Sequence, residues 1–156
     1  MASRADIFAY IESLLKTVKL GNSVTVRGTE YDFQTDLGLA VKPWRESALG
    51  EKENFDLVLS DEPSARVDSD VGEFGLGKFD MPVIMELRWK GKNARTQIEK
   101  SITDLTALFN SDYKLGGLVR NSLLEQRDKT STAYGVGVFG VVLALIVTYV
   151  PGPTEA

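Results

Sequence analysis

The sequence predicts an α+β domain in which an antiparallel or mixed β-sheet is flanked by two amphipathic helices. Apolar residues recur at helical spacing near the N-terminus and again after residue 93, which predicts the two helices. Between them, the segment Met81 to Lys90 alternates apolar and polar side chains in the manner of a strand. The chain has 156 residues, enough to bury a core of its own, so we expect residues 1–156 to form a single domain.

Each predicted helix has one apolar face and a residue that can cap its N-terminus. Ser3 with Asp6 three residues later resembles a capping box, and Gly21 can end the first helix after about four turns. Asn93 can cap the second helix. The apolar face of the first helix comprises Ile7, Phe8, Ile11, Leu14, Leu15 and Val18, and that of the second comprises Ala94, Ile98, Ile102, Leu105 and Phe109.

The remaining strands are shorter or less regular than the one at 81–90. Pro43 has no backbone N–H to donate, so we expect it at a sheet edge or at the end of a strand. A turn at Gly116 and Gly117 is expected to precede another strand. We expect strands around Val24 and Val26, at 39–44, at 54–60, and from Leu118 to about Gln126.

The segment from Asp61 to Asp80 is acidic and lacks the periodicity of a regular element. It is rich in carboxylates and contains three glycines and one proline. We interpret it as a long hairpin loop or projecting arm, since loops of this length inside a compact domain are usually functional or mobile. A solvated surface loop and an arm that orders against another subunit both remain open. A short tail follows at 151–156.

The apolar run from Ala133 to Val150 has three possible interpretations. It contains G-V-G-V-F-G at 135–140, a literal match to a dinucleotide-binding fingerprint, but the residues after it favour a strand rather than the required helix. It is also an uncharged stretch of 18 residues, long enough to suggest a membrane anchor. No Lys or Arg follows it, however, and its residues suit a strand. Bulky residues at odd positions and mostly smaller ones at even positions predict a long strand with protein on both faces.

Composition excludes several kinds of chemistry. The chain has no cysteine and no histidine, so it can form neither a disulfide, a thiolate nucleophile, a Ser-His-Asp triad nor a zinc site of the usual kinds. The net charge of -4 provides no overall positive field for holding nucleic acid. The N-terminal segment lacks the continuous apolar core of a signal peptide, so we expect the protein on the cytoplasmic side. We expect no cofactor and no metal.

Asp56, Glu86 and Arg88 give the best case for an enzyme. Asp56 on one predicted strand and Glu86 on another loosely match the carboxylate pair of metal-dependent nucleases. The position of the usual lysine holds Arg88, which cannot lose its proton. We therefore favour a solvated strand face over a catalytic site. We interpret Trp44 and Trp89 as core or interface anchors rather than base-stacking platforms.

The order of these elements resembles the tail terminator (tail completion) proteins of long-tailed bacteriophages. The likeness covers nearly the whole chain, from the N-terminal helix through the acidic hairpin and the strand-to-helix unit at 85–109. Its most telling parts are the D-x-x-L-G-G-L-V turn at Asp112 to Val119 and the final strand that ends in V-T-Y. The arm is long and the last strand unusually apolar, so other head-to-tail joining proteins remain an alternative.

The resemblance implies a structural virion protein rather than an enzyme. Such proteins form a hexameric ring that stops the growing tail tube at its final length and then presents a surface to the head connector. Its expected partners are further copies of itself, the tail tube protein and the head-completion or connector protein, at the tail–neck junction of the virion after assembly in the host cytoplasm. DNA would pass through the lumen without specific binding, which an acidic protein suits. No membrane contact is implied.

We expect the contacts of this ring to come from three places. These are the acidic arm, the small-residue side of the last strand, and exposed charges on the strand at 81–90. The residues expected at these contacts are Trp44, Asp61, Glu62, Asp68, Asp70, Glu73, Phe74, Phe79, Glu86 and Arg88. A C-terminally anchored membrane protein and a magnesium-dependent nuclease-like domain are the remaining alternatives.

Overall fold

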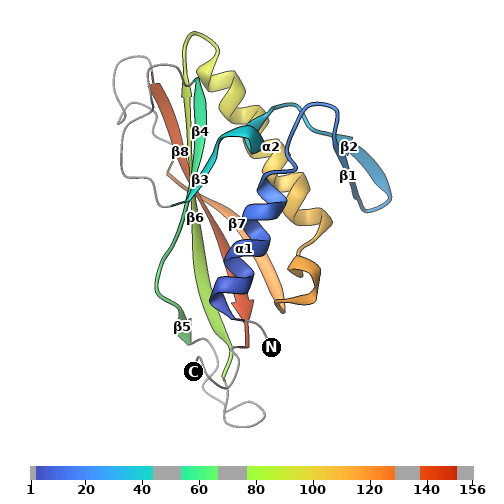
Figure 1. Cartoon of the computed structure of the whole chain (residues 1–156), viewed down its shortest axis with the longest axis vertical. Coiled ribbons are helices and arrows are strands. Elements are labelled where there is room, and N and C mark those ends of the chain that lie inside the picture. The colour runs from blue at the N-terminus through green and yellow to red at the C-terminus, as the bar shows by residue number, and fades with distance from the viewer. Residues whose placement is uncertain (1–2, 44–53, 67–76, 129–137, 151–156) are drawn as a thin grey trace.

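Two helices pack on one face of a mixed β-sheet, which confirms the α+β prediction (Figure 1). The computed structural model describes residues 3–43, 54–66, 77–128 and 138–150. A separate two-stranded sheet lies beyond the second helix at the side of the domain. The helices are α1 (Arg4–Leu15) and α2 (Ala94–Ser111).

The main sheet is antiparallel except at one edge. Its strands are ordered β3-β4-β6-β8-β7. The short β5 pairs with the first two residues of β6. Only β3 and β4 are parallel neighbours, and β3 ends at Pro43, so the proline lies on an edge strand as predicted. The strands are β3 (Val41–Pro43), β4 (Phe55–Asp61), β5 (Ala65–Arg66), β6 (Phe79–Lys90), β7 (Asn121–Asp128) and β8 (Val138–Tyr149).

The predicted capping of α1 is confirmed, whereas that of α2 is wrong. The Ser3 hydroxyl accepts a hydrogen bond from the backbone N–H of Asp6 at 3.0 Å. Asn93 precedes α2 but makes no side-chain capping bond, because its backbone (φ -98°, ψ 13°) is not in the extended region that directs a cap side chain back onto the helix. Helix α1 also ends earlier than expected, at Leu15.

The core lies between the helices and the odd-numbered residues of β6 and β8. It also includes the apolar residues of β4 that are on the same face. Its largest fully buried side chains are Ile7, Ile11, Leu15, Leu37, Leu57, Leu59, Met81, Met85, Leu87, Leu105, Leu108 and Leu115. Both predicted helix faces therefore point into one common core.

The apolar run near the C-terminus forms β8, as the strand interpretation predicted. Val138 to Tyr149 pairs along its whole length with β6, and its later part also pairs with β7. Gly140 is an ordinary position within this strand, while Gly135 and Gly137 lie outside the described residues. The described part of the run thus belongs to the chain's own sheet. None of the described helices is both long and apolar enough to cross a membrane.

The chain forms a β-hairpin between α1 and the main sheet, and the second strand of this hairpin was not predicted from the sequence. Strands β1 (Ser23–Val26) and β2 (Thr29–Asp32) pair through a two-residue turn at Arg27 and Gly28, where φ is 50° and 81°. Positive φ at both positions is the type I′ geometry that fits the twist of paired strands. The alternation of Val24 and Val26 correctly indicated β1.

Three further predicted boundaries are wrong. The strand expected at 39–44 begins at Val41, because Leu37 to Ala40 form a one-turn 3-10 helix, η1. The strand expected from Leu118 begins at Asn121, because Leu115 to Gly117 form a one-turn 3-10 helix, η3, and Leu118 follows in helical conformation. The Asp61 to Asp80 segment was expected to contain no regular element. Its ends instead join the sheet, where Ala65 and Arg66 pair with Asp80 and Phe79. Residues 67–76 of the expected arm lie outside the described residues.

Candidate functional site

The face of the sheet opposite the helices, here called the outer face, holds two of the predicted contact residues, Glu86 and Arg88. Residues directly opposite one another on antiparallel strands point to the same face. Among the described elements, both helices lie on the other side of β4 and β6 (Figure 1). The rows across the outer face include Asn121–Thr148–Asp80, Leu123–Ile146–Pro82, Glu125–Ala144–Ile84–Ser60, Val142–Glu86–Val58 and Gly140–Arg88–Asp56.

The outer face carries an apolar strip made of Leu123, Ile146, Pro82, Ile84 and Val142. Leu123 is 61% exposed, and the other four side chains are half-buried. Antiparallel sheets with one face toward water usually present polar residues there. The adjoining apolar side chains on three neighbouring strands therefore depart from that pattern.

A buried ion pair lies beside the apolar strip. The Arg88 guanidinium donates two hydrogen bonds to the Asp56 carboxylate, from Nε at 2.8 Å and from Nη2 at 2.6 Å. Asp56 is 0% exposed and Arg88 is 5% exposed, and Lys42 Nζ lies 3.6 Å from Asp56 Oδ2. Opposite Arg88 on β8 is Gly140, which has no side chain to occupy the space beside the guanidinium.

The prediction that Arg88 is an exposed contact charge is therefore wrong. The solvated-face interpretation also fails for Asp56, because both groups are buried and their charges are paired with one another. Glu86 is half-buried in the next row, opposite Val58. Among the described residues, acidic side chains form no cluster that could hold a metal ion. The arrangement is that of a structural ion pair.

Two other predicted contact charges form ion pairs inside the domain. Asp61 accepts a hydrogen bond from Arg4 of α1 at 2.6 Å. Glu62 pairs with Arg127 of β7, so this pair joins strands that are separated in the sheet by β6 and β8. Both carboxylates thus make ion pairs within the domain at the end of β4, and their predicted contact role stays a prediction.

The other predicted contact residues divide into one that is described and five that are not. The Phe79 ring lies 6.3 Å from the Tyr149 ring, so it packs at the paired ends of β6 and β8. The structure brings Glu86 and Arg88 together on the outer face, and Asp61 and Glu62 at the end of β4. Trp44, Asp68, Asp70, Glu73 and Phe74 lie outside the described residues.

Asp104 of α2 is a buried carboxylate that fastens the hairpin to the domain. It is 0% exposed and accepts hydrogen bonds from Tyr31 Oη at 2.7 Å, Thr35 Oγ1 at 2.6 Å and the Gln34 backbone N–H at 2.9 Å. Burial and the bond to Asp104 raise the pKa of Tyr31 to about 12. Sequence reasoning missed Asp104, although it lies three residues after buried Ser101 and next to Leu105, on the helix face that enters the core.

The D-x-x-L-G-G-L-V turn has a structural role that its spacing explains. Asp112 accepts hydrogen bonds from Tyr10 Oη of α1 at 2.6 Å and from the backbone N–H of Gly116 at 2.9 Å. Gly116 has φ of +66°, and a Cβ there would lie 2.9 Å from Tyr10 Oη. The bond to Asp112, with burial, raises the pKa of Tyr10. The motif thus fixes α1 against the chain that leads into β7.

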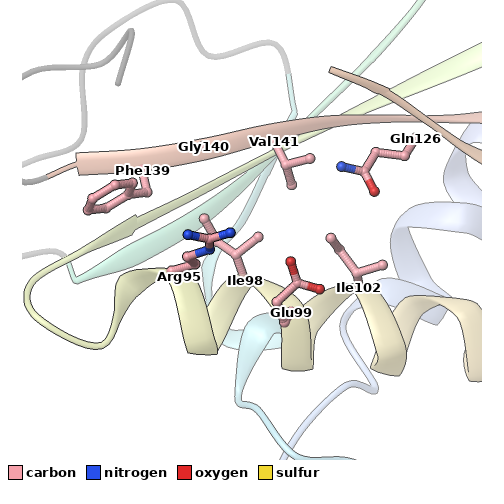
Figure 2. A pocket seen from close by; sticks show the side chains of 8 residues that line it. All are labelled: Arg95, Ile98, Glu99, Ile102, Gln126, Phe139, Gly140 and Val141. Carbon is pink, nitrogen blue, oxygen red and sulfur yellow. The ribbon is translucent and has the colours of Figure 1, made fainter. Parts of the chain in front are cut away.

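A cavity of about 490 Å³ lies between α2 and the strands β7 and β8. Figure 2 shows side chains of α2 facing those of β8 across it. Ile98, Ile102, Phe139 and Val141 give it apolar walls, and its polar side chains are Arg95, Glu99 and Gln126. These residues can accept an apolar side chain or a small amphipathic molecule. They supply neither a nucleophile next to a base nor a pair of acids.

No protein-family model matches this chain, and no curated protein matches it in sequence. The fold and the described surfaces define an α+β domain with helices on one sheet face and an apolar strip beside a buried ion pair on the other. Its function has to be inferred from these surfaces.

Proposed function

We propose that this chain is a structural virion protein that forms a ring on the end of a bacteriophage tail tube. The ring ends tube polymerisation and provides the surface to which the head connector binds. The apolar strip on the outer face carries this proposal, because it gives the domain a surface suited to another protein. The element order, which resembles tail terminator proteins, gives the proposal its particular form.

The shape of the strip favours a protein partner over a small ligand. Its residues follow the sheet across β7, β8 and β6, from exposed Leu123 to half-buried Ile84. Small molecules bind in concave sites that enclose most of their surface, whereas residues spread over a sheet face match the apolar centre of a protein interface. The same strip lies on the small-residue side of the last strand, which the sequence predicts as a contact surface.

The charge of the chain suits a ring through which DNA passes. The net charge of -4 disfavours retention of the phosphate backbone. The best candidate for a nuclease acid, Asp56, is held by Arg88 and Lys42, so its negative charge is compensated within the domain. Both observations support a structural role.

Electron microscopy of tail tubes tests this function. The cognate tail tube protein is polymerised alone and with the purified chain. We expect shorter tubes of uniform length with a ring of density at one end when the chain is present. Unchanged tube lengths with bare ends would contradict the proposal. Binding to the connector without any effect on tubes would assign the chain to the other head-to-tail joining proteins.

A further inference from the structure

Two exposed leucines lie in turns near the end of α1, and both turns are hydrogen-bonded to Asp36. Leu20 is 60% exposed and Leu39 is 65% exposed. Asp36 positions both, since its carboxylate accepts a hydrogen bond from the Leu20 N–H and its carbonyl accepts one from the Leu39 N–H, each at 2.9 Å. We call Leu20 and Leu39 the leucine knob.

The turn that carries Leu39 is docked closely on the end of α1. The Gly38 N–H donates to the Val18 carbonyl at 2.8 Å. A Cβ on Gly38 would lie 2.7 Å from the carbonyl oxygens of both Leu15 and Lys16, so only glycine permits this approach. The backbone therefore holds the knob in a fixed position while its side chains remain in water. Covering this apolar surface with another protein would lower the free energy.

A groove of complementary character lies between the β1–β2 hairpin and α2. This hairpin groove has a volume of about 400 Å³. Its apolar side chains are Val26, Tyr31, Ile102 and Ala107, and Thr103 and Thr106 of α2 also line it. Glu30 is the only charged residue among the described residues that line it.

We propose that the leucine knob of one subunit docks in the hairpin groove of a second copy of this chain. The inference deepens the ring proposed above and rests on it. Both surfaces are mainly apolar, and the charges beside them are opposite. Exposed Lys19 adjoins Leu20 in the knob, while exposed Glu30 lies at the groove. Opposite charges at the rim of an interface favour one orientation of the two partners.

This contact is heterologous, because it uses different surfaces on the two subunits. Each subunit that joins leaves one knob and one groove unoccupied until the first and last subunits meet. Such contacts close into rings when the rotation between neighbours fits. The outer face stays available for the tube or the connector.

Cysteine cross-linking tests this contact directly, because the native chain has no cysteine. We would prepare the full chain with Leu39→Cys in the knob and Thr106→Cys in the groove. The control carries Leu39→Cys with Thr96→Cys, an exposed threonine in the first turn of α2 outside the groove. Disulfides need Cα atoms within about 7 Å, so cross-linking reports close contact.

Under mild oxidation, we expect the first variant to give a ladder of dimers, trimers and larger species on a non-reducing gel. The ladder should collapse on reduction, and the control should remain monomeric. Equal patterns for the two variants, no ladder, or an intrachain disulfide would overturn the inference. If tubes are still capped in that case, the proposed function stands with a different subunit contact. A ladder without capping would retain the contact and reject the function.

Discussion

Replacing Arg88 by methionine is expected to lower the free energy of unfolding by about 3–5 kcal/mol. The substitution keeps much of the side chain's volume but removes both hydrogen bonds to Asp56. Asp56 is 0% exposed, so its charge would lose its closest partner while still shielded from water, leaving Lys42 at 3.6 Å as a weaker one. Urea denaturation followed by circular dichroism would measure the change.

Two further variants separate loss of the ion pair from loss of a side chain. Arg95→Met removes an exposed arginine from α2 and should change stability by less than about 0.5 kcal/mol. The double variant Asp56→Leu with Arg88→Met removes both charges and should recover most of the loss. If Arg88→Met alone costs less than about 1 kcal/mol, the pair is not the buried anchor that its geometry indicates.

Replacing Asp104 by alanine is expected to cost about 3 kcal/mol and to release the β1–β2 hairpin from α2. The carboxylate accepts bonds from Tyr31, Thr35 and the Gln34 backbone, and Thr35 is only 3% exposed. Removing the acceptor leaves the buried Thr35 hydroxyl and the half-buried Tyr31 hydroxyl without their partner. Thermal unfolding measures the cost, and hydrogen exchange of the hairpin amides measures the release.

Glu99 of the same helix provides the matched control. It is an exposed acidic residue, and Glu99→Ala should leave both stability and hairpin exchange within about 0.5 kcal/mol of the native chain. Equal effects of Asp104→Ala and Glu99→Ala would show that the buried network does not hold the hairpin. Faster exchange spread over the whole domain, rather than focused on the hairpin, would point to general destabilisation.

The long elements of this fold are predictable because each has a strong period. Helices α1 and α2 bury one continuous stripe each, and β6 alternates almost without exception. Strand β2 has no such signal, since Tyr31 is its only partly buried residue. The start of β7 was misplaced because Leu118 and Val119 have strand-like side chains but still belong to the turn that Gly116 and Gly117 impose.

The candidate site was less predictable because it depends on register. Asp56 and Arg88 are 32 positions apart and meet only because β4 and β6 pair with these two residues opposite one another. Their sequence positions, alternating with apolar residues, indicated an exposed face. Asp104 is different: its place on the apolar face of α2 was a signal for a buried polar partner that sequence reasoning missed, and only the identity of that partner required the structure.

The most direct test of the account is whether the outer face is needed to cap tail tubes. Leu123→Asp places a charge at the exposed end of the apolar strip, and Ala9→Asp places the same charge on an exposed position of α1. Both positions are exposed, so both variants should fold with melting temperatures close to that of the native chain. In the tube assay, we predict that Ala9→Asp caps tubes as the native chain does and that Leu123→Asp leaves them long and bare. Capping by the folded Leu123→Asp variant at native efficiency would contradict the central claim.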